Sequence, residues 1–185
     1  MEIVKRDYAH KRKLALEVLN KPGISESDKL FVQLQMEAYE KDEIAILKRY
    51  QSRINVLEHE IVNLKAQASL AGTTDENVRS TLIGEIETRN MYGGVAKAKD
   101  AKETLEAELA AASAYMNVCN HEKNVGIVFG EKVDKEYLES LIEDYQLNYI
   151  EPRGKKYAEA SKLYDQLYAE MQAVNSSVLP KDAIL

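Results

Sequence analysis

The sequence has no tryptophan, one cysteine, three prolines and eight glycines among its 185 residues. A single cysteine cannot form a disulfide within the chain, so nothing in the sequence requires an oxidising compartment. Few proline and glycine residues, together with many Ala, Glu, Lys and Leu residues, are typical of long helices. The scarcity of helix breakers therefore favours an all-α fold.

The sequence also lacks excess positive charge and long apolar runs. Its net charge of −6 at pH 7 argues against a general binder of nucleic acid or of anionic membranes, because both need a positive surface. No run approaches the roughly 18 apolar residues of a membrane helix, and the N-terminus lacks the apolar core of a signal peptide. We expect an intracellular protein, cytoplasmic or incorporated in a particle, that is not secreted by a signal peptide and has no membrane partner.

What is present is a series of helical segments separated by helix breakers. An amphipathic helix covers residues 3–19, and Pro22 and Gly23 prevent it from continuing. Ser25 is the expected cap of a helix that runs from about residue 27 to 71, and a second helix follows from about 75 to 119. Two helices of roughly 45 residues that are joined by a short turn predict an antiparallel hairpin.

Both long helices carry apolar residues spaced alternately three and four apart, a pattern that packs against a partner helix. The first stripe consists of Leu47, Tyr50, Ile54, Leu57, Ile61, Leu64, Ala68 and Ala71. The second consists of Met91, Val95, Ala98, Leu105, Leu109, Ala112, Met116 and Cys119. We expect the two stripes to face each other, with Leu64 opposite Ile83 and Phe31 opposite Met116. Gly93 and Gly94 leave open whether the second helix is continuous or kinked.

The C-terminal part begins with a glycine-bounded apolar segment, Val125 to Phe129, which favours an extended strand. Because one strand cannot satisfy its own backbone groups, we expect it to pair with another edge, for example that of a partner subunit. Asp134 is the expected cap of a short acidic helix to about residue 148. Pro152 and Gly154 then predict a break before a last helix at about 155–174.

The predicted architecture is all-α: a long, coiled-coil-like antiparallel hairpin with an N-terminal helix, a C-terminal pair of shorter helices and one short extended segment near 125–129. We predict three parts. Residues 1–123 form the N-terminal helix and hairpin, residues 124–133 form an extended connector, and residues 134–185 form the C-terminal helical pair and tail.

The sequence does not contain a recognisable catalytic or metal-binding pattern. Cys119 and His121 lie close together, but a zinc site needs four ligands, and the other histidines, His10 and His59, are far away in sequence. We expect Cys119 to be a small apolar residue of the helix contact and His59 to be solvated on the outer face of its helix. We therefore predict no catalytic, cofactor-binding or metal-binding residue, no cofactor and no enzyme activity.

Candidate interaction residues gather in four segments of the chain. They are Lys5, Arg6, Lys11 and Arg12 in the basic N-terminal helix; Val125, Ile127 and Phe129 in the extended segment; Glu139, Glu143 and Asp144 in the acidic helix; and Ile184 and Leu185 in the tail. The first 13 residues hold five Lys or Arg, and residues 134–151 hold six Asp or Glu. The basic helix is expected to meet the acidic helix of a neighbouring molecule, unless the two pair within one chain.

Long helical hairpins without catalytic clusters are typical of spacers and assembly parts. We predict a non-enzymatic structural subunit of a multi-protein machine, such as a virion or a secretion apparatus, whose partners are its own copies or neighbouring proteins. One alternative is a soluble adaptor, inhibitor or chaperone of a single protein partner. A third reading is weak binding of nucleic acid through the basic N-terminus.

Overall fold

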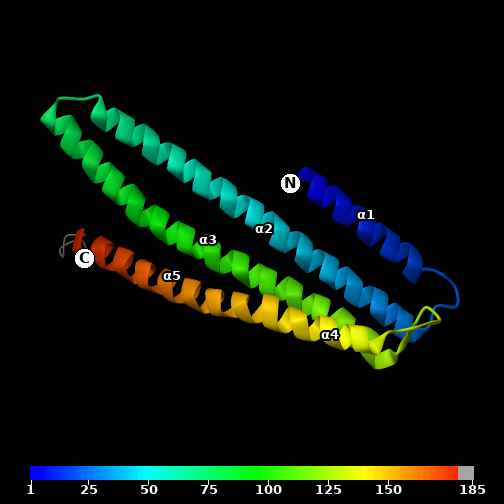
Figure 1. The fold of residues 1–185 in the computed structure, drawn as a ribbon. Coiled ribbons are helices and arrows are strands. Elements are labelled where there is room, and N and C mark those ends of the chain that lie inside the picture. Colours follow the sequence, from blue (N-terminus) through cyan, green and yellow to red (C-terminus); the bar gives the residue numbers. More distant parts are fainter. Residues whose placement is uncertain (179–185) are drawn as a thin grey trace, which may run out of the picture. The chain divides into compact units, whose positions relative to one another are not determined.

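The computed structural model describes residues 1–178, and this part of the chain is almost entirely helical (Figure 1). In chain order the elements are α1 (Glu2–Leu19), α2 (Glu26–Ala71), α3 (Glu76–Val125), β1 (Ile127–Val128), β2 (Glu131–Lys132), α4 (Lys135–Tyr145), a π-helical turn η1 (Gln146–Ile150) and α5 (Glu151–Val178). The predicted all-α fold with long helices packed against each other is confirmed.

Short polar side chains fix where the long helices begin. The Ser25 hydroxyl accepts the backbone N–H of Asp28 at 3.0 Å, as expected for the cap of α2. At the start of α3, an oxygen of Asp75 accepts the N–H groups of Asn77 at 2.9 Å and of Val78 at 3.2 Å. Because these side chains satisfy N–H groups that have no partner inside the helix, Ser25 fixes the start of α2 and Asp75 fixes the start of α3.

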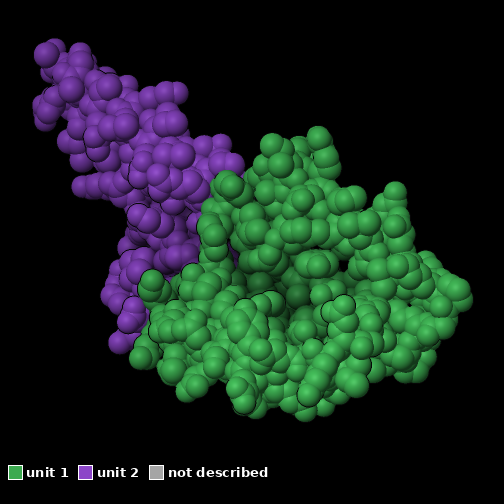
Figure 2. All heavy atoms as spheres, turned by 45° about the vertical axis from the view of Figure 1, so that its right-hand side comes forward, with its two compact units in different colours: residues 1–50, 104–157 green, residues 51–103, 158–185 purple. Residues whose placement is uncertain are grey.

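The chain divides into two compact units, which Figure 2 shows in different colours. Unit 1 contains residues 1–50 and 104–157, and unit 2 contains residues 51–103 and 158–185. Helices α2, α3 and α5 each contribute to both units. Each of these helices is therefore divided between the two units at a point along its length. The predicted ranges 1–123, 124–133 and 134–185 follow chain order and stay a prediction.

Unit 1 has two small apolar clusters. One joins α1, α2 and α3, and the other joins α3 to α4. Their buried members are Ala15, Phe31, Val32 and Val118 in the first cluster, and Met116, Cys119 and Leu138 in the second. Phe31 and Met116 therefore belong to different clusters, and the expectation that they face each other is wrong.

A buried charge holds three helices of unit 1 together. Glu108 of α3 is only 8% exposed, and its carboxylate accepts hydrogen bonds from Arg49 of α2 at 2.6 Å and from Arg153 of α5 at 2.9 Å. The Arg153 guanidinium also stacks on the ring of Tyr149, 3.4 Å from its centroid. Sequence reasoning missed this cluster, although Glu108 lies next to Leu109 at the edge of the apolar stripe.

The connector between α3 and α4 is a small hairpin and not a single strand. β1 pairs antiparallel with β2, with Val128 opposite Glu131. The expectation that this segment pairs with another edge is confirmed, but the edge is β2 of the same chain, three residues later, and not the suggested edge of a partner subunit. Gly126 and Gly130 have positive φ angles of 72° and 81°, a conformation that glycine adopts without steric cost, and these positions allow the tight turn.

The predicted break at Pro152 does not occur, because a π-helical turn links α4 to α5. The backbone N–H of Glu151 donates to the carbonyl of Gln146, five residues earlier. In a regular helix a proline ring collides with the carbonyl four residues before it. The wider π turn directly before Pro152 relieves this collision, so the expected pair of shorter helices forms one uninterrupted helical run.

In unit 2, α3 contacts α2 through polar side chains. Asn55 donates to Asp100 at 2.8 Å, and Asn63 donates to Asn90 at 2.9 Å. These pairs show a hairpin register different from the predicted one, since residue 63 and not residue 57 lies opposite residue 90. Helix α3 continues through Gly93 and Gly94 without a break, which answers the question that the sequence left open.

Within unit 2, α5 contacts α3 through two side-chain interactions. The Tyr92 hydroxyl donates to Asn175 at 3.0 Å, and the Lys102 ammonium lies 5.3 Å from the ring centroid of Tyr164. Within residues 1–178, no helix has the length and apolar character needed to cross a membrane.

Candidate functional site

The predicted basic residues of α1 are largely engaged inside the chain. Three of the four form ion pairs: Lys5 with Glu2, Lys11 with Asp7, and Arg12 with Glu43 of α2. The ring of the buried Tyr8 lies beneath Lys11, and the Tyr8 hydroxyl donates to Asp42. Burial, followed by that hydrogen bond, raises the pKa of Tyr8. The contacts of Arg12 with Glu43 and of Tyr8 with Asp42 attach α1 to α2, whereas the other two ion pairs lie within α1. Arg6 is the member of the set without an ion pair in residues 1–178.

The predicted acidic residues lie on α4, apart from that basic set. Glu139 pairs with Lys123 of α3 at 3.9 Å, and Asp144 accepts a hydrogen bond from Asn148 at 2.6 Å. Glu143 is exposed. Within the described residues, no ion pair joins the basic residues of α1 to the acidic residues of α4, so the alternative pairing inside one chain is not formed there, and the contact with a neighbouring molecule stays a prediction.

The predicted apolar residues of the connector remain accessible. Ile127 is 58% exposed and Phe129 is 49% exposed, while Val125, the last residue of α3, is 36% exposed. The Phe129 backbone, at a φ of 49°, donates its N–H to Asp28 at 2.7 Å. That hydrogen bond, together with one from Ser25, lowers the pKa of Asp28. The last predicted residues, Ile184 and Leu185, lie outside the described part of the chain.

Cys119 and His121 point to different surroundings. Cys119 is only 3% exposed, and burial raises the pKa of its thiol, so the reactive thiolate form is disfavoured. The Nε2–H of His121 donates to the carbonyl of Ser27 at 3.0 Å, and the ring stacks on Phe31. Within residues 1–178, no group of three or more His, Cys, Asp or Glu side chains is arranged to hold a metal ion.

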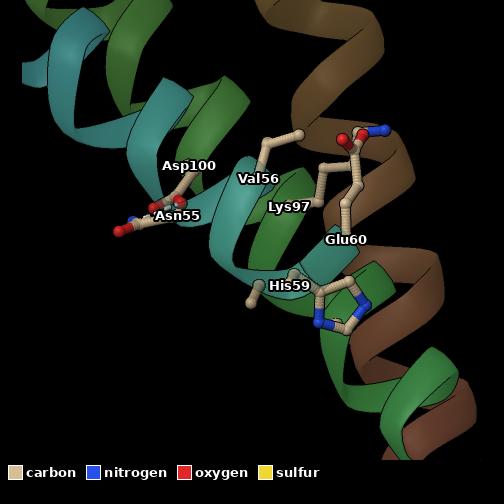
Figure 3. Close-up of a pocket in the computed structure, with 8 residues that line it drawn as sticks. Asn55, Val56, His59, Glu60, Lys97 and Asp100 are labelled. Carbon is tan, nitrogen blue, oxygen red and sulfur yellow. Dashed lines mark hydrogen bonds between the residues drawn. The ribbon is translucent and has the colours of Figure 1, made fainter. Parts of the chain in front are cut away.

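His59 lies against α3 and not on the outer face of α2, which corrects the expectation from the sequence. Figure 3 shows its ring at a cavity of about 190 Å³ that α2 and α3 line with residues including Asn55, Glu60, Lys97 and Asp100. This volume is below the roughly 300–1,000 Å³ of most ligand pockets, but a second, more open hollow of about 590 Å³ shares Asn55, His59 and Asp100. We assign no ligand to either.

The most unusual surface of the molecule is the apolar stripe of α2 in unit 2. Ile54, Leu57, Ile61 and Leu64 are 39%, 42%, 51% and 64% exposed. The expectation that this stripe faces α3 is wrong, although the matching stripe on α3 is buried at Val95 and Ala98. The heptad spacing correctly indicates that a partner helix is needed, but spacing alone does not identify the partner.

The face of α2 that does contact α3 is mostly polar or small, with Val56 as its apolar member. It carries Asn55, His59, Asn63 and the buried Ala66. An amphipathic helix normally buries its apolar side and exposes its polar side, and α2 has the opposite arrangement within this unit. We therefore take the exposed stripe, Ile54, Leu57, Ile61 and Leu64, as the candidate functional site and refer to it as the α2 stripe.

The α2 stripe can contribute apolar contacts and charge-based selectivity to another helix. Arg53, Glu58, Glu60 and Lys65 flank the stripe, and all four are exposed. None of them forms an ion pair within the described residues. Comparison with models of known protein families, with curated proteins and with solved structures gave no match.

Proposed function

We propose that this chain is a non-enzymatic helical subunit of a larger protein assembly and that it acts through protein–protein contacts on the α2 stripe. The observation that carries the proposal is the inverted arrangement of α2, with its polar face on α3 and its heptad stripe exposed. Heptad-spaced apolar residues are typical of a helix that packs along another helix. A partner would remove this apolar surface from water, which is the main favourable term in most protein association.

The alternative of a monomeric adaptor for one protein partner uses the same surface. It differs from the assembly proposal in the size of the complex, because an adaptor forms one small complex and an assembly subunit occurs in large ones.

The test measures the size of the complexes that contain the chain in its source cells. We expect the native chain in a high-mass fraction and the Ile61→Lys variant at the monomer mass of 20.9 kDa, because a charge on the stripe opposes its burial. Leu163→Lys is the matched control, since Leu163 of α5 is 48% exposed and Ile61 is 51% exposed. If all three proteins run at the monomer mass, or if the two variants behave alike, the proposal is wrong.

A further inference from the structure

The α2 stripe has the residue pattern of a parallel two-stranded coiled coil. If Ile54 is assigned to heptad position a, then Ile54 and Ile61 both occupy a, and Leu57 and Leu64 both occupy d. Among parallel coiled coils, isoleucine at a and leucine at d favour two strands over three or four. The same assignment places the residues that contact α3 at the remaining positions: Asn55 at b, Asn63 at c, and His59 and Ala66 at f.

The positions that a coiled-coil partner would contact are all accessible. From Arg53 to Lys65, the four a and d residues and the four flanking e and g residues are exposed. The contact with α3 and the contact with a partner helix therefore use different faces of α2. A second helix along the α2 stripe would not compete with the hairpin.

The charges beside the stripe are complementary to a parallel copy of themselves. In a parallel coiled coil, the residue at g of one helix meets the residue at e, five positions later, on the other. Arg53 at g then meets Glu58 at e of the second copy, and Glu60 at g meets Lys65 at e. Two-fold symmetry repeats both contacts, so all four flanking charges gain an oppositely charged partner.

An antiparallel copy centred on the same residues would instead place like charges opposite each other. Antiparallel helices bring e against e and g against g, so Glu58 would meet Glu58 and Glu60 would meet Glu60. Like charges placed opposite each other disfavour an arrangement. The charge pattern therefore favours a second copy of α2 that runs parallel to the first over one that runs antiparallel.

We propose that the α2 stripe of a second copy of this chain covers the first, with the two helices parallel and in register. This inference rests on the proposed function, because it names the partner of the same surface. The contact is isologous, since the same residues meet across a two-fold axis, and it therefore yields a closed dimer. Larger assemblies would use such dimers as their building unit.

The first experiment tests the direction of the two helices in the purified full chain with a Leu64→Cys variant. A disulfide needs Cα atoms within about 7 Å, and position d of a parallel pair brings the two copies of residue 64 together. In the antiparallel arrangement residue 64 lies opposite residue 54, about 15 Å away along the helix. We expect a covalent dimer after mild oxidation. The controls are the native chain, whose one cysteine is buried, and a Leu163→Cys variant, and we expect both to remain monomeric on a non-reducing gel.

The second experiment tests the charge pairs by sedimentation over a range of concentrations. We expect Glu58→Arg to weaken the dimer about tenfold, because it places two arginines opposite each other on both sides of the interface. Adding Arg53→Glu to this variant swaps the pair, and we expect the dimer affinity to return to within about threefold of the native value. The swap restores affinity only if residues 53 and 58 of different copies meet. Circular dichroism checks that both variants keep the native helix content.

Each result separates this inference from the proposed function. A purified chain that stays monomeric while large complexes form in cells would overturn the second copy as partner and keep the proposed function. Self-association without the Leu64→Cys disulfide, or without rescue by the charge swap, would overturn the parallel register alone. Monomers in both settings would overturn both proposals.

Discussion

Among single residues, Glu108 carries the largest charge cost in the fold. Its carboxylate is 8% exposed, while the side chains of its partners Arg49 and Arg153 are 59% and 28% exposed. The hydrogen bonds from both arginines offset the cost of removing a carboxylate from water. The hydrogen bond from Arg49 to Glu108 also raises the pKa of Arg49. The cluster joins α2, α3 and α5 in unit 1.

Glu108→Gln is therefore expected to destabilise the protein although it preserves the side-chain volume. It removes the negative charge and leaves two guanidinium groups without a carboxylate, for a loss of about 1–3 kcal/mol in the free energy of unfolding. Urea unfolding followed by circular dichroism measures this loss. Glu106→Gln, two residues away on the exposed face, is the control and is expected to change stability by less than about 0.5 kcal/mol. Equal effects of the two changes would contradict the role given to Glu108.

Gly93 and Gly94 provide a matched pair, because the two neighbours in α3 have different surroundings. A Cβ atom at Gly93 would overlap the imidazole ring of His59, whereas one at Gly94 would meet nothing within 4 Å. Glycine in a helix costs roughly 0.5–1 kcal/mol relative to alanine. The same Gly→Ala substitution is therefore expected to change the stability of the protein differently at the two positions.

We expect Gly94→Ala to stabilise the protein by about 0.5–1 kcal/mol and Gly93→Ala to lose this gain, because the His59 ring has to move away from α3. The thermal unfolding midpoint reports both changes. Adding His59→Ala to the Gly93→Ala variant removes the ring and should bring the effect of the alanine at 93 closer to that at 94. Equal stabilisation by Gly93→Ala and Gly94→Ala would show that the His59 contact contributes nothing measurable.

At the scale of elements, Asp28 attaches the β1–β2 connector to the start of α2. It accepts the N–H of Phe129 and interacts with the Ser25 hydroxyl. Because these hydrogen bonds lower the pKa of Asp28 in the folded state, its carboxylate stabilises the fold at pH values above its ordinary pKa, which is near 3.9. That contribution is lost as the pH falls through the lowered pKa.

Asp28→Asn should therefore weaken the attachment at neutral pH and have little further effect in acid. Amide hydrogen exchange at Phe129 is the measurement, with the native chain and the variant compared between pH 7 and pH 3. We expect faster opening in the variant at pH 7 and a smaller difference in opening between the two proteins at pH 3, after correction for intrinsic exchange. Identical opening at pH 7 would rule out this contact as the anchor.

The helices themselves follow from local chemistry, and most were predictable. Ser25 caps α2 as expected, and the α3 stripe is buried at Val95 and Ala98 as its spacing indicated. The break at Pro152 was predicted from a rule for regular α-helices, and a π turn satisfies the proline by a different hydrogen-bond pattern. Local rules describe typical geometry, so they fail where the chain adopts a rare one.

The pairing of helices was less predictable for a physical reason. A heptad stripe indicates that a helix needs a partner but does not specify which partner. Asn55 and Asn63 contact α3 through hydrogen bonds. Since helix contacts are predicted from the spacing of apolar residues, this polar face of α2 was not recognisable as a contact. Glu108 was missed for a related reason, because a buried charge is recognisable only once Arg49 and Arg153 are known to surround it.

At the scale of the whole molecule, two kinds of surface compete as the main route of association. The predicted electrostatic route joins the basic residues of α1 to the acidic residues of α4 in a neighbouring molecule. Most of these charges already have partners in the chain, including Arg12 with Glu43 and Glu139 with Lys123. The α2 stripe offers apolar surface together with four charges that have no ion pair within the described residues.

The response to different salts separates these two routes. Sodium chloride shortens the reach of exposed charges from about 10 Å at 0.1 M to about 3 Å at 1 M, so a purely electrostatic contact should dissociate as either chloride or sulfate is added. Sulfate also strengthens the burial of apolar surface, since it is excluded from the protein surface. For the α2 stripe we expect a modest loss of dimer in chloride, as the ion pairs weaken, and a gain in sulfate at equal ionic strength.

Sedimentation of the purified chain in both salts, with Ile61→Lys as the control that should stay monomeric throughout, measures the difference. Equal dissociation in the two salts would instead favour the contact between α1 and α4.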